Sequence, residues 1–165
     1  MADQLLRCDA ENNLPSQPVA LIITPTRELA LQVKTELDWL YAETDLVLAS
    51  AVGGMDIRTE RRALSGRVDV LIGTPGRLVD HLNRNSFDAY NLRVVVLDEA
   101  DEMLDMGFRE DLETLLKAAP EQRRTLMFSA TVPRTIAALA RRYQRDAVRV
   151  ETASEEEQHL SLIHI

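Results

Sequence analysis

Two adjacent carboxylates, Asp98 and Glu99, directly follow the apolar run at residues 94–97. A continuous run of Val and Leu is typical of a strand that is covered on both faces, as in a parallel sheet between helices. Ligands of such sheets collect at the carboxyl ends of the strands, so both acids are expected on that edge. There, one acid can hold Mg²⁺ through water and the next can polarise an attacking water. The alternative is a solvated acidic turn, because Glu102 and Asp105 continue the negative run.

Two earlier strands are predicted to end in a similar way, in Thr24-Pro25-Thr26-Arg27 and in Thr74-Pro75-Gly76-Arg77. Thr is a good N-cap and Pro suits the first helical position, so each segment predicts the start of a helix. Helix amino termini attract anions, and two of them on one edge favour a row of phosphates, as in a nucleic-acid backbone. For either segment alone, a well-started helix is the simpler explanation. An Arg in the first turn opposes the helix dipole, however, which indicates another role for both arginines.

A fourth strand, at residues 125–128, runs into Ser129-Ala130-Thr131. Two short hydroxyl side chains at this place are suited to bind a neighbouring carboxylate, and Asp101 is the expected partner if the two strands are adjacent. The alternative is that Thr131 caps a helix that begins near Pro133.

Strand and helix patterns alternate along the chain, which predicts an α/β fold with a parallel sheet flanked by helices. Residues 1–153 are expected to form one domain and residues 154–165 a linker or tail, of which 160–165 either opens a second domain or is vector-derived. The expected strands are 19–23, 46–52, 68–73, 93–97, 125–128 and 147–151, and the expected helices are 25–41, 56–64, 75–83, 108–118 and 133–144.

Composition limits the class of protein. At 165 residues and 45% hydrophobic content, one domain with an adequate core is expected, and no apolar run approaches the length of a membrane span. A single cysteine, Cys8, excludes an internal disulfide, and no secretory signal is recognisable at the start. Both observations favour a cytoplasmic location.

The net charge of −8 argues against a general nucleic-acid binder, which usually carries a basic stripe. The objection is partial, because most of the basic residues are arginines, which make forked contacts with phosphates. An aromatic content of 4% leaves little material for base stacking. Any RNA recognition is therefore expected to involve the backbone rather than the base sequence.

Five segments, taken in order, resemble the first RecA-like domain of DEAD-box ATP-dependent RNA helicases. They are Pro25-Thr26-Arg27-Glu28-Leu29-Ala30, Gly53-Gly54, Thr74-Pro75-Gly76-Arg77, Asp98-Glu99-Ala100-Asp101 and Ser129-Ala130-Thr131.

The resemblance implies a role for each segment and a requirement for ATP and Mg²⁺. Asp98 would help to hold the Mg²⁺, and Glu99 would be the general base. Asp101 would bond the Ser129 and Thr131 region and so couple nucleotide state to domain closure. RNA phosphates and sugars would be gripped by the three other segments, Pro25 to Glu28, Gly53-Gly54 and Thr74 to Arg77.

The sequence departs from this family where a phosphate-binding P-loop is expected. That loop is a Gly-rich turn with a Lys, placed before the Pro25 segment. All six glycines lie after residue 52, and the only lysines are Lys34 and Lys117. We therefore expect a truncated piece of a helicase that does not bind ATP tightly. The alternative is a non-catalytic module that binds RNA backbone or protein and has a degenerate nucleotide site.

In the resembling family, the missing P-loop strand lies between the strands expected at 125–128 and 147–151. Its loss is expected to expose an open, partly apolar edge, which recruits another strand. The chain would then self-associate across this edge or fill it with residues 160–165. Alternatively, the last strand would move inward to pair with residues 125–128.

Overall fold

The computed structural model describes residues 17–151 of the 165-residue chain. Its centre is a five-stranded sheet with the order β2-β3-β1-β4-β5, in which every neighbouring pair is parallel. The strands are β1 (Ala20–Ile23), β2 (Leu48–Ala51), β3 (Val70–Gly73), β4 (Val94–Leu97) and β5 (Arg124–Met127). The predicted α/β class, with a parallel sheet, is confirmed.

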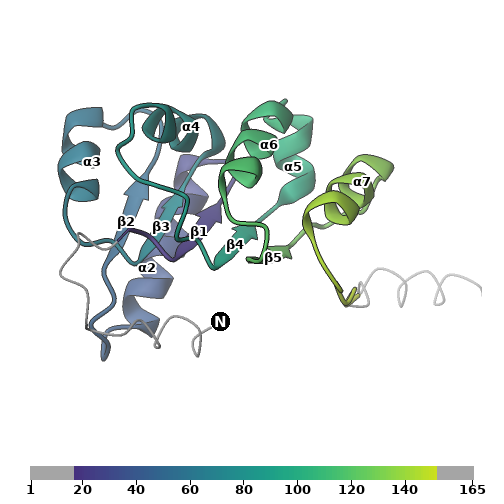
Figure 1. Cartoon of the computed structure of the whole chain (residues 1–165), viewed down its shortest axis with the longest axis horizontal. Coiled ribbons are helices and arrows are strands. Elements are labelled where there is room, and N and C mark those ends of the chain that lie inside the picture. The colour runs from purple at the N-terminus through teal and green to yellow at the C-terminus, as the bar shows by residue number, and fades with distance from the viewer. Residues whose placement is uncertain (1–16, 152–165) are drawn as a thin grey trace, which may run out of the picture.

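Helices cover both faces of the sheet (Figure 1). One face carries α2 (Arg27–Leu40). The opposite face carries α3 (Ile57–Leu64), α4 (Pro75–Asn83), α5 (Ala100–Asp105), α6 (Arg109–Ala118) and α7 (Arg134–Tyr143). The apolar sides of these helices pack on alternate residues of the strands, which is the period-2 pattern of a sheet with two covered faces. Within residues 17–151, no helix is long and apolar enough to cross a membrane.

The three inner strands and the two outer strands differ in burial. All four residues of β1, β3 and β4 are buried, as their continuous apolar runs predict. In β2, buried and half-buried residues alternate, and β5 has one exposed, one buried and two half-buried residues. The sheet is therefore well covered at its centre and less so at β5.

The register brings the carboxyl ends of the strands to one level. Ile23 lies opposite Gly73 and Leu97, and these in turn lie opposite Ala51 and Met127. Gly73 permits a close approach of β2 and β3, since a Cβ atom there would lie 2.2 Å from the carbonyl oxygen of Ala51. The segment that follows each strand consequently starts at the same edge of the sheet.

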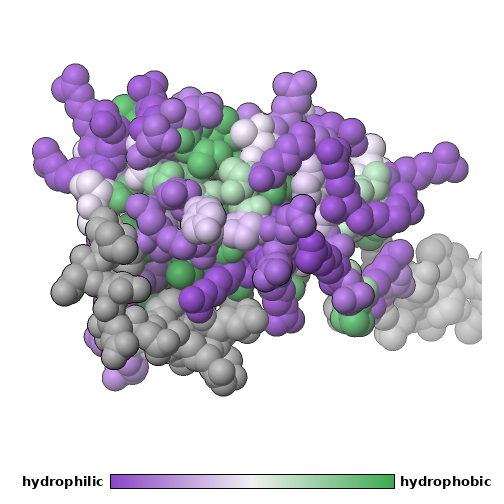
Figure 2. Space-filling model, viewed as in Figure 1, coloured by the Kyte–Doolittle hydropathy of each residue, from purple (hydrophilic) through white to green (hydrophobic). Residues whose placement is uncertain are grey.

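The strand predicted at 147–151 is wrong. This segment has no strand pairing, and Val148 and Val150 are 86% and 81% exposed. Figure 2 shows hydrophobic colour where the described chain ends, beyond α7. The side-chain amide of Gln144 donates to the carbonyl oxygen of Thr125 on β5 (3.0 Å), so part of the edge that a further strand needs is already used. Within the described residues, no last strand moves inward to pair with β5. The predicted linker or tail at 154–165, which includes the segment expected to fill the edge, lies outside the described residues.

Two helix predictions also need correction. Residues 100–105 form α5, a helix that was not among the expected elements and that takes the place of the acidic turn considered as the alternative; Ala100 and Met103 are fully buried and anchor this short helix to the core. In α2 the capping residue is Thr26 rather than Thr24, so Pro25 precedes the helix. In α4, Thr74 occupies the cap position and Pro75 the first helical position, as predicted, but the Thr74 side chain makes no capping hydrogen bond.

Candidate functional site

The candidate residues lie along one edge of the sheet, in the order of the strands. Gly53-Gly54 follows β2, Thr74 to Arg77 follows β3 and Pro25 to Glu28 follows β1; these three segments form the arginine half of the edge. Asp98 to Asp101 follows β4 and Ser129 to Thr131 follows β5; these two segments form the acidic half. Segments that are far apart in sequence thus form two contiguous groups.

In the acidic half, Asp98 is held by the backbone at the exit of β4. Its N–H group donates to the carbonyl oxygen of Ile23 (2.9 Å), and its Oδ1 accepts from the N–H group of Glu99 (3.1 Å). Glu99 has φ 50° and ψ 53°, the left-handed conformation that side-chain-bearing residues rarely adopt. Strain of this kind is typical of functional sites. Glu99 lies between β4 and α5, and its side chain is exposed.

These residues fit Mg²⁺ but do not fit a complete nucleotide site. Mg²⁺ is commonly bound through one or two carboxylates, water and substrate phosphates, and Asp98 with Glu99 supplies that chemistry. Within residues 17–151, no group of three or more His, Cys, Asp or Glu side chains is arranged as a metal cage. The sequence contains no Gly-rich Lys loop to hold the triphosphate. The geometry therefore supports a metal that arrives with phosphates, and no hydrolytic step follows from the residues present.

Asp101 joins the ends of β4 and β5. Its Oδ2 accepts hydrogen bonds from the backbone N–H (2.8 Å) and the hydroxyl (2.7 Å) of Thr131, and its own N–H donates to Ser129 Oγ (3.3 Å). Burial alone would raise the pKa of Asp101, but the hydrogen bonds from Thr131 and Ser129 outweigh it and lower the pKa to about 2. The predicted contact is present, and Thr131 does not cap α7, where the cap is Pro133.

In the arginine half, Thr26 caps α2 by accepting from the N–H of Leu29 (3.2 Å). Arg27 is therefore the first helical residue and is exposed, with no ion pair among residues 17–151. Glu28 is exposed beside it, whereas Pro25 is buried. A Cβ atom on Gly54 would lie 3.0 Å from Arg27 Nη1, so this guanidinium lies against the Gly53-Gly54 turn.

Arg77 differs from Arg27, although both lie in the first turn of a helix. Its Nε lies 3.6 Å from Glu60 Oε2, and its Nη2 donates to the carbonyl oxygen of Met55 (3.1 Å). The Arg77 side chain is only 15% exposed. Its contact with RNA stays a prediction, and in this structure its guanidinium is directed toward Met55 and Glu60 of the protein.

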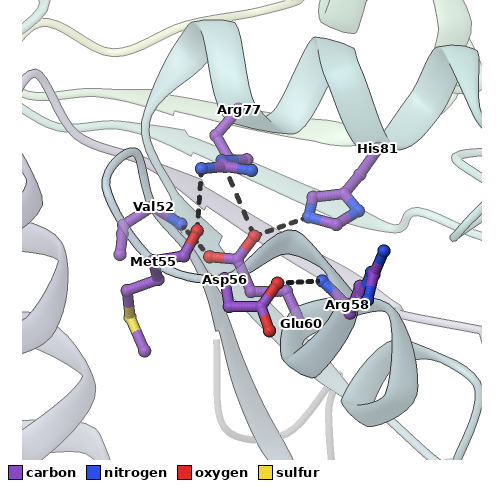
Figure 3. A network of polar contacts seen from close by, with 7 residues as sticks. All are labelled: Val52, Met55, Asp56, Arg58, Glu60, Arg77 and His81. Carbon is purple, nitrogen blue, oxygen red and sulfur yellow. Dashed lines mark hydrogen bonds and ion pairs between the residues drawn. The ribbon is translucent and has the colours of Figure 1, made fainter.

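Sequence reasoning missed Glu60, the buried partner of this arginine, and His81, which contacts Glu60 (Figure 3). His81 Nε2 lies 2.7 Å from Glu60 Oε2, and both side chains are almost completely buried. The signal was available in the helix pattern. Ile57, Glu60 and Leu64 have the spacing of one helical face, so Glu60 occupies a position where a core residue is expected.

A sequence model described as DEAD/DEAH box helicase matches residues 2–139. The chain is 43% identical over 160 residues to DEAD-box ATP-dependent RNA helicase 9 of Oryza sativa subsp. japonica, covering 96% of this chain and 25% of the relative. It is 44% identical over 137 residues to DEAD-box ATP-dependent RNA helicase CshA of Geobacillus kaustophilus, covering 83% of this chain and 29% of the relative.

Among solved structures, a DEAD box protein from the hyperthermophile Methanococcus jannaschii superposes with a TM-score of 0.75 at 43% identity. The match covers 81% of this chain and 36% of that one. The five-stranded parallel sheet and its flanking helices therefore match the RecA-like fold of DEAD-box proteins. The chain spans 25% and 29% of the length of the rice and Geobacillus relatives. On the motifs, their order along the sheet and these matches, the chain belongs to the DEAD/DEAH box helicase family.

Proposed function

We propose that this chain is part of an ATP-dependent RNA helicase, in which it supplies one RNA-gripping edge and the acids of the nucleotide site. The observation that carries the proposal is the register of the strands, which brings five segments to one edge in two chemically distinct halves. The printed names of the rice and Geobacillus relatives, both ATP-dependent RNA helicases, support it. RNA unwinding or remodelling is then the activity of the whole protein.

In the whole protein, the acidic half would supply two carboxylates: Asp98 would hold Mg²⁺ through water, and Glu99 would accept a proton from the attacking water. Asp101 couples nucleotide state to domain movement through Ser129 and Thr131, because its short bonds to Thr131 tie the segment after β5 to α5. ATP, when bound to the whole protein, would supply the phosphoanhydride bond that water cleaves. This chain would then orient the metal and the water, and positioned groups of this kind account for most of the catalysis in phosphoryl transfer.

The arginine half binds single-stranded RNA through its backbone, without sequence preference. Arg27 is exposed at a helix amino terminus, where the helix dipole and free N–H groups also favour a phosphate. Fluorescence anisotropy with a short unstructured RNA tests this proposal. We expect weak binding that falls steeply between low and physiological salt, because each phosphate contact releases counterions. Unchanged binding after combined Arg27→Ala and Arg77→Ala substitution would contradict the assignment.

A second candidate function for the isolated chain is a non-catalytic RNA-backbone or protein-binding module. The absence of a Gly-rich Lys loop from the 165 residues favours it. We expect no measurable ATP hydrolysis by this chain, with or without RNA. Phosphate release that is stimulated by RNA and abolished by Glu99→Gln would instead show that the chain holds ATP by other means.

We also propose that a second copy of the chain binds across the β5 edge. Phe128 and Val132, which flank the acidic half, are 55% and 46% exposed, and edge strands with apolar neighbours recruit further strands. Light scattering on the chain with and without residues 160–165 tests this. Dimers of both versions support the proposal. Monomers in both contradict it, and a dimer that forms only after the deletion assigns the edge to the terminal segment.

A further inference from the structure

Glu60 is a buried carboxylate that contacts Val52, Arg77 and His81 (Figure 3). Its side chain, on α3, is 2% exposed. Oε1 accepts from the N–H of Val52 (2.9 Å), while Oε2 lies 2.7 Å from His81 Nε2 and 3.6 Å from Arg77 Nε. Removing a carboxylate from water is unfavourable by several kcal/mol unless hydrogen bonds and opposite charge compensate for it. An apolar side chain would fill this core position without that requirement, so the network specifies a geometry rather than adding bulk stability.

The geometry that it specifies is that of the Gly53-Gly54 turn. Glu60 holds the N–H of Val52 immediately before the two glycines, and Arg77 donates to the carbonyl oxygen of Met55 immediately after them (3.1 Å). Both glycines are exposed, and a Cβ atom built on Gly53 would meet nothing within 4 Å. The turn is therefore positioned at its two ends, by one carboxylate and one guanidinium that also form an ion pair.

The same turn contacts the other arginine of the edge. Gly54 has φ +80°, and a Cβ atom there would lie 3.0 Å from Arg27 Nη1. A shift of the turn would consequently change the space available to the Arg27 guanidinium. The contacts run from His81 through Glu60 and Arg77 to the turn, and from the turn to Arg27.

We propose that Glu60 is a positioning residue for RNA binding, which fixes the Gly53-Gly54 turn against Arg27 before RNA arrives. This inference rests on the proposed RNA-binding function. A surface that is ordered in advance loses less conformational freedom on binding, and the affinity rises accordingly. In this arrangement Arg77 acts on RNA mainly through the turn, whereas Arg27 meets the phosphate directly.

The salt dependence of RNA binding separates these two roles. For single strands, the slope of log K against log salt changes by about 0.7 for each phosphate contact. Arg27→Ala should therefore make the slope shallower by about 0.7, the loss of one contact. Glu60→Gln should weaken binding about fivefold, at the lower end of typical coupling between sites, and leave the slope unchanged. Arg77→Met should behave like Glu60→Gln rather than like Arg27→Ala.

Each variant has a control. Glu60→Gln preserves the shape of the side chain and an acceptor for Val52, and the matched change of charge at an exposed site is Glu36→Gln on α2. Arg77→Met removes the ion pair and the Met55 bond while the Val52 and His81 contacts of Glu60 remain, which provides a second variant if Glu60→Gln does not fold. Circular dichroism establishes folding. Amide hydrogen exchange of Val52 should be faster in Glu60→Gln and unchanged in Glu36→Gln.

The double variant Glu60→Gln plus Arg27→Ala tests whether the two residues act together. If Glu60 acts through the turn on Arg27, the combined loss of affinity is smaller than the product of the single losses, whereas independent effects multiply. Suppose that Arg27→Ala weakens RNA binding, while the folded Glu60→Gln and Arg77→Met variants bind RNA like the unmodified chain. This result would overturn the role of Glu60 and leave the proposed RNA-binding function intact. An unmodified chain that binds no RNA would overturn the proposed function, and the RNA role of Glu60 with it.

Discussion

The arginine half and the acidic half lie on one edge, yet they are supported in opposite ways. Behind the arginine half lie fully buried strands β1 and β3 and a buried network around Glu60. Behind the acidic half, β4 is equally buried but β5 is partly exposed, and the side-chain contact between the two segments joins the half-buried Asp101 to the exposed Thr131. This contrast underlies the two proposals made above, that the turn of the arginine half is fixed before RNA arrives and that a second copy binds across the β5 edge.

The largest effect on stability is expected from disturbing the packing of β2 against β3, the strands that precede two segments of the arginine half. Gly73→Ala would place a Cβ atom 2.2 Å from the carbonyl oxygen of Ala51, so β2 and β3 must separate. We expect the free energy of unfolding to fall by about 3 kcal/mol, the upper end for overpacking. Urea denaturation measures it. Gly53→Ala is the control, because nothing lies within 4 Å of its added Cβ atom; equal losses in both variants would refute the explanation.

The open side of the acidic half is tested by adding charge at the exposed apolar residue beside it. Phe128→Lys should weaken self-association by about tenfold, equivalent to about 1.4 kcal/mol, because a lysine on an edge opposes strand pairing. Sedimentation velocity over a range of concentrations measures the change. The same substitution at Tyr90, which is 76% exposed and precedes β4, is the control. A dimer that tolerates Phe128→Lys would place the interface elsewhere.

Within the acidic half, Asp101→Asn is expected to lower the free energy of unfolding by about 1 kcal/mol at pH 7, after allowance for solvent screening. The pKa of Asp101 in the folded chain, about 2, lies below the ordinary aspartate value of 3.8, so the carboxylate stabilises the fold above about pH 4. That contribution is lost as the pH falls from about 4 to 2. Thermal unfolding at pH 7 and pH 3 should show the difference between variants shrinking. Asp105→Asn, at an exposed site, should show no such trend.

The smallest effect on stability is expected from Arg27→Ala, a substitution that should change stability and RNA binding in opposite directions. Arg27→Ala removes a positive charge from the positive end of α2 and should raise the free energy of unfolding by about 0.3 kcal/mol. The same substitution should weaken RNA binding. The matched control is Arg62→Ala in the last turn of α3, where a basic residue is favourable and its loss should be slightly destabilising. Destabilisation by Arg27→Ala would show that this arginine has a structural role.

The parallel sheet, and the edge at which the candidate residues collect, were predictable because they depend on local patterns. Continuous apolar runs predicted β1, β3 and β4, and the adjacency of β4 and β5 explains why Asp101 contacts Thr131 as expected. The roles assigned to the site residues remain predictions.

Contacts between distant segments were less predictable. The pairing of Glu60 with His81 and Arg77 depends on how α3 and α4 pack, which no single helix pattern reveals. Only the unusual placement of a carboxylate on a core-facing position signals it. The strand expected at 147–151 failed for a related reason. β-prone residues such as Val148 and Val150 form a strand only when they pair with a neighbouring strand, and within the described residues this segment pairs with none.

The central claim is that RNA binds at the carboxyl ends of β2, β3 and β1. Nuclear magnetic resonance of the labelled chain during titration with a short single-stranded RNA tests it most directly. We predict that backbone amide shifts concentrate at Gly53, Gly54, Arg27 and Thr74. The opposite end of the sheet offers a competing basic surface, a hollow lined by Arg93, Arg123, Arg124 and Arg145. Shifts confined to that hollow, with the Gly53-Gly54 turn unchanged, would contradict the account.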